Sequence, residues 1–555
     1  MIDVRIQDVY PHQAWYKPGE QARLHVDLHS TRSEEFQGTL RGRLLFLTEE
    51  VEREEVPLHL SGAGTHRVDI QLPLPSEQPR GYGVEVTLVD KQGRSVGQRW
   101  TALDVLTHWT EAPRYGFVSD FSPDRSDIEE TMEWLVRYHI NALQFYDWMY
   151  RHDTLLPPED RYRDPLGRLL SRRTIEAMVK AAARRHIASM AYVAVYAASV
   201  PFWRQHREWG LYNGQGTPIP FGDDFLYIMN PEPDSRWTHH LLQEMANAVR
   251  AISFEGVHLD QYGEPREGFD NEGYYVDVAR AFAGFIKMTK YYLHERGVPS
   301  TVVFNAVNNW PIDALASTPQ DFMYIELWPP HTHFKDLWSL TVAAQRKSGG
   351  KPVVLAAYMS PSHSYNVRLM NAIIFASGGA HIELGERERM LADPYFPKHE
   401  PISSRLSTVL RRYYDFAVQY ENVLRLDTED ITDEIRGRVK LEGIGLTHEG
   451  ENNRVWVIGR RGMGMDILQF INLAGLKTPQ WTEPVFLPPP PLHNLQVRYY
   501  TQHTVRRVWL ASPDTKIPAA REISFTRGTN SRGPFVEFVV PSLKWWTLIG
   551  LTHSI

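Results

Sequence analysis

Between residues 113 and 425, short apolar runs alternate with stretches that have the spacing of amphipathic helices, and this alternation constrains the fold more than any other feature. An apolar run followed by a helix predicts a strand buried on both faces and then the crossover of a parallel sheet. The apolar runs are 115–121, 140–148, 187–196, 256–262, 301–307, 322–328, 352–358 and 380–384. Eight runs are the number that a (β/α)8 TIM barrel needs, and a doubly wound open sheet is the alternative.

Two of the intervening helices show clear patterns. In the segment 126–139, Ser126 and Glu129 have the spacing of a capping box and predict that a helix begins there. The segment 236–252 has the same helical period. The apolar faces comprise Ile128, Met132, Leu135 and Val136 in the first helix, and Leu241, Leu242, Met245, Val249 and Ile252 in the second. Each helix is therefore expected to pack one face against the barrel.

The two ends of the chain have a different pattern, in which apolar and polar residues alternate and turn residues separate the runs. This pattern predicts antiparallel strands. A chain of 555 residues is also too long for a single hydrophobic core. We therefore expect an α/β fold with three domains: an immunoglobulin-like β-sandwich over 1–110, a catalytic (β/α)8 barrel over 111–425, and a C-terminal β-sandwich domain over 426–555.

Composition excludes several classes of function. The formal net charge of −7 comes without a dense Lys/Arg patch, so no nucleic-acid partner is expected. The absence of cysteine rules out disulfides, thiolate metal ligands and a cysteine nucleophile. No apolar run approaches the length of a membrane span, so no membrane partner is expected. The first residues do not resemble a signal peptide, which predicts a cytoplasmic protein as the sequence stands, or a secreted one whose signal has been removed.

Some short motifs imitate known sites. The segment "GRSVG", Gly93–Gly97, matches a nucleophile-elbow pattern, but it joins two predicted strands, so we expect a hairpin turn there. The pairs His239/His240 and His331/His333 lack the H-E-x-x-H spacing of a metal site. We therefore expect neither a metal ion nor a cofactor.

Acidic residues gather at the ends of the predicted strands, where barrel enzymes carry their working side chains. They are Asp120, Asp147, Asp260, Glu326 and Glu383, with Asn305 on the fifth strand and the aromatic residues Tyr146, Trp148, Tyr192, Tyr196, Tyr262 and Trp328 among them. Charges at buried strand ends are costly unless they are paired or used. Asp120 and Glu383 could instead cap helices or pair with Arg114 or Arg387. Two carboxylates that face an aromatic groove suit glycoside hydrolysis.

The ordered motifs resemble one family. "NALQFYDWMYRHD", "SMAYVAVYAA", "GVHLDQYGE", "FNAV", "YIELWP" and "GGAHIELGE" are similar to barrel motifs of glycoside hydrolase family 66, the endo-dextranases and cycloisomaltooligosaccharide glucanotransferases. The β regions before and after the barrel, including "DILQFINL", also match that family's layout. The resemblance covers nearly the whole chain.

The resemblance implies a retaining glycoside hydrolase that acts on α-1,6-linked glucan, with Asp260 as the nucleophile and Glu326 as the acid/base. Residues expected to contact the substrate are Asp120, Tyr146, Asp147, Tyr192, Tyr196, Gln261, Tyr262, Asn305, Trp328 and Glu383. Cyclising members of the family carry an extra module near the seventh strand. Only about 20 residues separate "LAAYMS" from "GGAHIEL" here, which favours the endo-dextranase. A glucanotransferase and a non-catalytic glucan-binding protein remain as alternatives.

Overall fold

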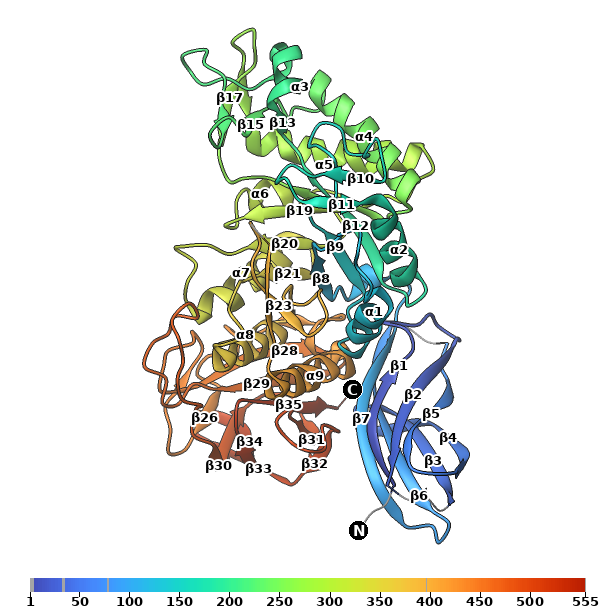
Figure 1. Cartoon of the computed structure of the whole chain (residues 1–555). Coiled ribbons are helices and arrows are strands. Elements are labelled where there is room, and N and C mark those ends of the chain that lie inside the picture. Colours follow the sequence, from blue (N-terminus) through green and yellow to red (C-terminus); the bar gives the residue numbers. More distant parts are fainter. Residues whose placement is uncertain (1–3, 32–34, 77–78, 396, 555) are drawn as a thin grey trace.

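The computed structural model describes residues 4–31, 35–76, 79–395 and 397–554, and a barrel lies at its centre (Figure 1). Eight parallel strands form one sheet in the order β22-β21-β20-β19-β16-β12-β9-β8. Their bounds are β8 Tyr115–Val118, β9 Ala142–Phe145, β12 Ala188–Ala194, β16 Gly256–Asp260, β19 Thr301–Val307, β20 Met323–Glu326, β21 Val353–Ala356 and β22 Ala380–His381. Each strand lies inside one of the eight predicted apolar runs. The predicted barrel is confirmed, and the open doubly wound sheet is wrong.

The barrel nearly closes between its last and first strands. The Phe117 amide donates a 2.8 Å hydrogen bond to the Leu384 carbonyl, which follows β22. At this seam a Cβ atom on Gly385 would lie 1.7 Å from the Phe117 carbonyl oxygen, so only glycine allows the two strands to approach. Closure matters for function because it brings the ends of all eight strands to one rim.

Helices cover the outside of the barrel. The principal helices are α1 Ile128–Arg137, α2 Arg172–Ala183, α4 Arg236–Ile252, α5 Val278–Glu295, α7 Phe334–Lys347, α8 Ser364–Ala376 and α9 Ser404–Gln419; α3 Val200–Gln205, α6 Ile312–Leu315 and α10 Glu421–Leu424 are short. The predicted apolar face of α4 is buried in full, and that of α1 is buried except for the partly exposed Ile128.

The predicted capping box at Ser126 is wrong. Asp127 occupies the position before the first turn of α1. The Glu129 carboxylate does not turn back toward Ser126, because it pairs with Arg184 and with Arg185 of the neighbouring chain segment after α2, the latter at 2.8 Å. A tertiary ion pair has therefore replaced a local cap.

Short hairpins follow the carboxyl ends of four barrel strands and form the rim of the barrel. They comprise β10 Arg161–Arg163 with β11 Leu169–Ser171, β13 Ala197–Ser199 with β15 Leu226–Ile228 and β14 Pro220–Phe221, β17 Glu267–Phe269 with β18 Tyr275–Asp277, and β23 Arg389–Asp393 with β24 Lys398–Pro401. These insertions extend the barrel wall beyond the strand ends.

The N-terminal region consists of two antiparallel sheets that enclose their own apolar core. One sheet has the order β1-β2-β5 (Val4–Pro11, Gln21–Ser30, Gly64–Pro73), and the other β4-β3-β6-β7 (Glu49–Leu60, Phe36–Phe46, Arg80–Asp90, Ser95–Val105). The pattern of the sequence did not identify β1 or the charged strand β4. The "GRSVG" segment lies in the turn between β6 and β7 and at the start of β7, with Gly93 at φ +78°, as expected for a hairpin.

The C-terminal region also contains two sheets. One has the order β25-β28-β29-β35-β31-β32 (Glu429–Asp430, Val455–Gly462, Met465–Asn472, Trp546–His553, Val505–Ala511, Arg521–Ile523), with β27 Leu446–Thr447 beside β28. The other has the order β26-β30-β34-β33 (Val439–Leu441, Leu492–Tyr500, Gly533–Leu543, Phe525–Asn530). The last apolar run of the sequence is divided between β34 and β35, which belong to different sheets. The domain boundaries near residues 110 and 425 stay predictions.

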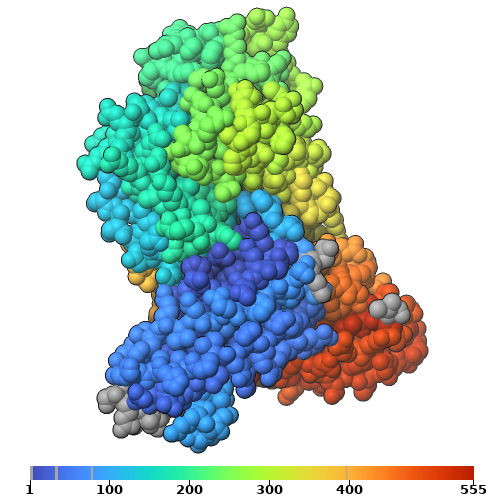
Figure 2. All heavy atoms as spheres, turned by 90° about the vertical axis from the view of Figure 1, so that its right-hand side faces the viewer, coloured from blue at the N-terminus to red at the C-terminus, as the bar shows by residue number. Residues whose placement is uncertain are grey.

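The three regions meet below the barrel, and Figure 2 shows the N-terminal sheets against both the barrel and the C-terminal region. A buried ion cluster lies at this junction. Arg114, which precedes β8, lies 2.8 Å from Asp104 of β7 and 2.8 Å from Glu421 of α10. All three side chains are at most 2% exposed. Among the described residues, no helix is long and apolar enough to cross a membrane.

Candidate active site

Two carboxylates face each other at the carboxyl ends of barrel strands. Asp260 is the last residue of β16 and Glu326 is the last residue of β20, and β19 runs between these strands. From β19, the Asn305 amide nitrogen donates hydrogen bonds of 2.8 Å to Asp260 Oδ1 and 2.8 Å to Glu326 Oε2. Because one atom contacts both, these two oxygens lie at most about 5.6 Å apart, the sum of the two bonds.

Two tyrosines hold the other oxygen of each carboxylate. The Tyr192 hydroxyl on β12 donates to Asp260 Oδ2 at 2.8 Å, and the Tyr358 hydroxyl after β21 donates to Glu326 Oε1 at 2.9 Å. All these contacts come from neighbouring strands of one sheet, so the backbone of the barrel fixes the orientation of both acids. The site is preorganised before any ligand arrives.

The electrostatic environment favours different protonation states for the two acids. Burial, together with the negative charge of Asp260, raises the pKa of Glu326 to about 7, although hydrogen bonds from Asn305 and Tyr358 oppose the shift. Burial also raises the pKa of Asp260, but Tyr192, Asn305 and the Gln261 amide all donate to it and favour its ionised form. The pair therefore holds a proton near neutral pH, and we assign that proton to Glu326.

A third acid, Asp147, follows β9 in a left-handed conformation with φ +48°. Burial raises its pKa to about 7, although the charge of Arg168 opposes this shift. Its side chain is 5% exposed and its carboxyl group has no hydrogen bond to the described part of the protein. A buried, unpaired carboxyl group at the rim is suited to a ligand that carries hydroxyl groups.

These residues line a cavity of about 290 Å³. Its wall consists of Phe117, Gln144, Tyr146, Asp147, His152, Leu166, Tyr192, Phe221, Phe225, Asp260, Gln261, Tyr262, Asn305, Tyr324, Glu326, Tyr358, Pro394 and Tyr395. No lysine or arginine is among these lining residues. A largely aromatic wall with a few hydrogen-bonding groups is suited to a neutral, hydroxylated ligand.

The structure places eight of the twelve predicted site residues on this wall: Tyr146, Asp147, Tyr192, Asp260, Gln261, Tyr262, Asn305 and Glu326. Tyr196 lies behind the wall, where its ring stacks on Tyr262 and its hydroxyl donates to the Glu264 carbonyl. Trp328 lies beside the cavity and contacts Tyr358 and Tyr395.

Asp120 and Glu383 are not on the wall. Asp120 is exposed, and its carboxylate accepts from the Ser122 amide in the turn after β8. Glu383 is buried among Asn371, Tyr414 and His381. Among the described contacts, neither acid pairs with Arg114 or Arg387, the partners considered from the sequence. Glu383 pairs with His381 instead, and Asp120 accepts from the Ser122 backbone amide.

The most important residue that sequence reasoning missed is Tyr358. Tyr358 ends the seventh predicted strand, so the strand-end argument could have found it. That argument was applied to acidic residues first, and it passed over a tyrosine at the same position. Gln144 and Tyr324 each stand two residues before a predicted site residue and share its face of the strand. His152, Phe225 and Tyr395 come from loops, and Phe221 comes from the two-residue strand β14, so no periodic pattern indicates their direction.

Known proteins have sequences related to nearly the whole of this chain. Cycloisomaltooligosaccharide glucanotransferase of Niallia circulans is 24% identical over 708 aligned residues, which cover 99% of this chain and 72% of the relative. Dextranase of Streptococcus salivarius is 22% identical over 92% of this chain and 72% of its own length.

Among solved structures, a Paenibacillus cycloisomaltooligosaccharide glucanotransferase complexed with cycloisomaltoheptaose superposes with a TM-score of 0.91, at 23% identity, over 99% of this chain and all of that one. The maltogenic α-amylase AmyB of Thermotoga neapolitana reaches 0.52 at 11% identity, over 80% of this chain and 99% of that one. At these identities the structural likeness shows the fold alone.

The sequence model of glycosyl hydrolase family 66 matches residues 11–550 and thus extends from β1 through the barrel to β35. Its match includes the whole cavity wall and both central carboxylates. The chain therefore belongs to glycosyl hydrolase family 66.

Proposed function

We propose that the protein is an endo-dextranase that hydrolyses α-1,6-glucosidic linkages with retention of anomeric configuration. The observation that carries the proposal is the shared contact of Asn305 with Asp260 and Glu326, which keeps the nearest carboxylate oxygens within about 5.6 Å. Retaining glycosidases have carboxyl groups about 5–5.5 Å apart, whereas inverting enzymes need about 6.5–9.5 Å to admit a water molecule.

In the proposed mechanism, ionised Asp260 attacks the anomeric carbon while Glu326 gives its proton to the departing glycosidic oxygen. The glucosyl group is then bound covalently to Asp260. Glu326, now ionised, takes a proton from water, and the water oxygen displaces Asp260 to release the sugar. Asn305 and Tyr192 donate hydrogen bonds to Asp260 and fix the orientation of its carboxylate group for the attack. The mechanism requires no metal ion or cofactor.

The proposed substrate is dextran and its isomaltooligosaccharides. The relatives named above are dextranase and cycloisomaltooligosaccharide glucanotransferase, and both names refer to such glucans. The cavity wall supports a neutral sugar, because most of its side chains are aromatic or uncharged and no lysine or arginine is among the lining residues. Asp147 is placed to accept hydrogen bonds from sugar hydroxyls.

Hydrolysis is preferred to cyclisation because the chain is short near the seventh strand. The segment between β21 and β22 runs from residue 357 to 379 and holds little more than α8. The alignment with the glucanotransferase of Niallia circulans extends over 708 residues, more than the 555 of this chain, so that relative contains internal segments absent here. The alignment with the dextranase extends over 608 residues, so its length exceeds that of this chain by less.

Product analysis on dextran tests the proposal. We expect a ladder of linear isomaltooligosaccharides, and proton NMR of the first products should show the α anomer, because retention preserves the configuration of the substrate. Mainly cyclic products would support the glucanotransferase, which is the second candidate because the relative from Niallia circulans carries that name. Initial release of the β anomer would refute the retaining mechanism. Binding without any cleavage would identify a non-catalytic glucan-binding protein.

A further inference from the structure

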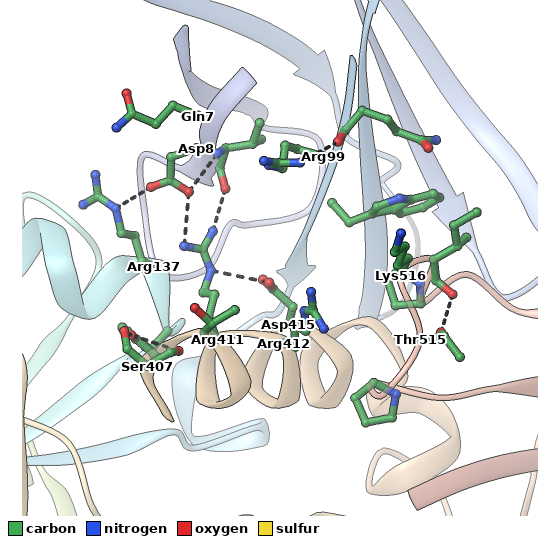
Figure 3. Close-up of a pocket in the computed structure, with 18 of the residues that line it drawn as sticks. Gln7, Asp8, Arg99, Arg137, Ser407, Arg411, Arg412, Asp415, Thr515 and Lys516 are labelled. Atoms are coloured by element: carbon green, nitrogen blue, oxygen red, sulfur yellow. Dashed lines mark hydrogen bonds and ion pairs between the residues drawn. The ribbon is translucent and has the colours of Figure 1, made fainter. Parts of the chain in front are cut away.

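A second hollow lies away from the cavity of the active site. It has a volume of about 930 Å³ and shares no lining residue with that cavity. Strands β1 and β7 of the N-terminal region, helices α1 and α9 of the barrel, and the loop 513–518 of the C-terminal region enclose it (Figure 3). We call it the junction cleft, because all three regions of the chain contribute to its wall.

The acidic residues of the junction cleft are already neutralised. Asp8 lies 2.8 Å from Arg137 and 3.5 Å from Arg411, and these cations hold the pKa of Asp8 below its ordinary value despite its burial. Asp415 accepts from His139 at 2.7 Å and from Thr101 at 3.0 Å, and it lies 3.4 Å from Arg411. Both acids of the cleft therefore already have a cationic partner.

Three further cations line the same cleft and have no carboxylate partner within the described ranges. They are Arg99 on β7, Arg412 on α9 and Lys516 in the loop after β31. Among the described contacts, the Arg99 side chain donates a hydrogen bond to the carbonyl of its neighbour Gln98 and to no carboxylate. Figure 3 shows these three side chains around the open centre of the cleft. Each comes from a different region of the chain.

This excess of positive charge is local. The whole chain has a formal net charge of −7, yet the lining of the junction cleft holds five arginine or lysine side chains against two aspartates. Like charges gathered in one concave site repel one another, and a bound anion relieves that repulsion. A neutral glucan would not do so, which separates this site from the proposed activity on dextran.

We propose that the junction cleft binds a phosphate group, either free or carried on a sugar, and that Arg99, Arg412 and Lys516 provide its charge contacts. A doubly charged anion matches three unpaired cations better than a single carboxylate does. The cleft also has room for a sugar next to the phosphate, and Trp100 and Trp134 supply apolar surface in its wall. Because the cations come from three regions, the bound anion would hold these regions together.

Isothermal titration of the full chain with potassium phosphate tests the proposal, with potassium chloride of equal ionic strength as the reference. The variant R99Q/R412Q/K516Q removes the unpaired charges. The matched control R204Q/R280Q/K287Q removes three exposed charges from helices α3 and α5, far from the cleft in sequence and fold. We expect phosphate to bind the wild type and the control alike, and to bind the triple variant at least about tenfold more weakly.

A parallel titration with glucose 6-phosphate distinguishes the two sources of phosphate. Tighter binding than inorganic phosphate would identify a phosphorylated saccharide as the ligand, and equal or weaker binding would identify free phosphate. The single variants R412Q and K516Q are each expected to weaken binding, so the test survives if the triple variant fails to fold. Cleavage of dextran should not change in any of these variants. Absence of phosphate binding by the wild type, or equal binding by the triple variant, would overturn the proposal.

Discussion

Two clusters of buried acids lie at opposite ends of the same barrel, and they differ in what surrounds them. At the upper rim, Asp260 and Glu326 share the amide of Asn305, and no cation is among the residues that line their cavity. At the junction below, Asp104 and Glu421 share the guanidinium of Arg114. The first cluster has no cation in its cavity wall, whereas the second surrounds a buried arginine.

This difference separates a reactive site from a structural one. Burial raises the pKa of Glu326 to about 7 and, together with Asp104, that of Glu421 to about 8, so each cluster can hold a proton at neutral pH. Only Glu326 lines the cavity of the active site, where a substrate can receive that proton. The same residue types, equally buried, thus serve chemistry in one place and connect regions in the other. The following predictions test the two halves of this comparison.

The largest effect is expected at the upper cluster. D260N removes the proposed nucleophile and should lower kcat on dextran by about 10⁴-fold or more. The unfolding free energy should stay unchanged or rise, because a buried charge without a cation is removed. The control E383Q changes a strand-end acid outside the cavity wall and should retain most activity. Dextran cleavage by D260N at the wild-type rate would refute the nucleophile assignment.

At the junction, the effect should appear in stability. R114M removes the cation that is bonded to both Asp104 and Glu421, although the charge of Arg425 still lies near them, and should reduce the unfolding free energy by about 3–5 kcal/mol, as measured by urea denaturation. The variant R114M/D104N/E421Q, which neutralises the stranded acids, should recover much of this loss. If R114M is as stable as the wild type, the cluster does not join the regions as described.

The smallest effect concerns the pH profile. Glu326 must be protonated to act as the acid, so kcat/KM should fall as the pH rises above about 7. The Tyr358 hydroxyl donates to Glu326 and favours its ionised form, so Y358F should raise the pKa of Glu326 and move this fall to higher pH, by less than about one unit.

The control for this profile is Y395F. Tyr395 lines the same cavity but has no hydrogen bond to Glu326 among the described contacts, so its removal should leave the fall in kcat/KM where it is. A shift toward lower pH in Y358F would contradict the proposed role of the hydroxyl.

Much of this architecture could be predicted from the sequence, because apolar runs that are buried on both faces are a local signal. The eight runs specify the strands, and the strand-end rule then selected Asp260, Glu326 and Asn305 together. The same rule also selected Asp120 and Glu383, because it cannot tell which way a side chain turns after a strand ends.

The rest depends on contacts between distant segments. The partner of Glu383 is His381, two residues away, but its bond to Tyr414 of α9 requires the folded barrel. The junction cleft brings together Arg99, Arg412 and Lys516, which no periodic pattern connects. Helix α1 begins after Asp127 and not after Ser126, because the Glu129 carboxylate pairs with arginines near the end of α2.

The Arg114 cluster also has a consequence for the order of events during synthesis. The carboxylate of Asp104 leaves the ribosome shortly before Arg114, but Glu421 follows 307 residues later. Until α10 has been translated, the arginine lacks one of its two carboxylate partners. Nascent chains that stop before residue 421 should therefore remain sensitive to protease, and protection should arrive only with the last part of the barrel.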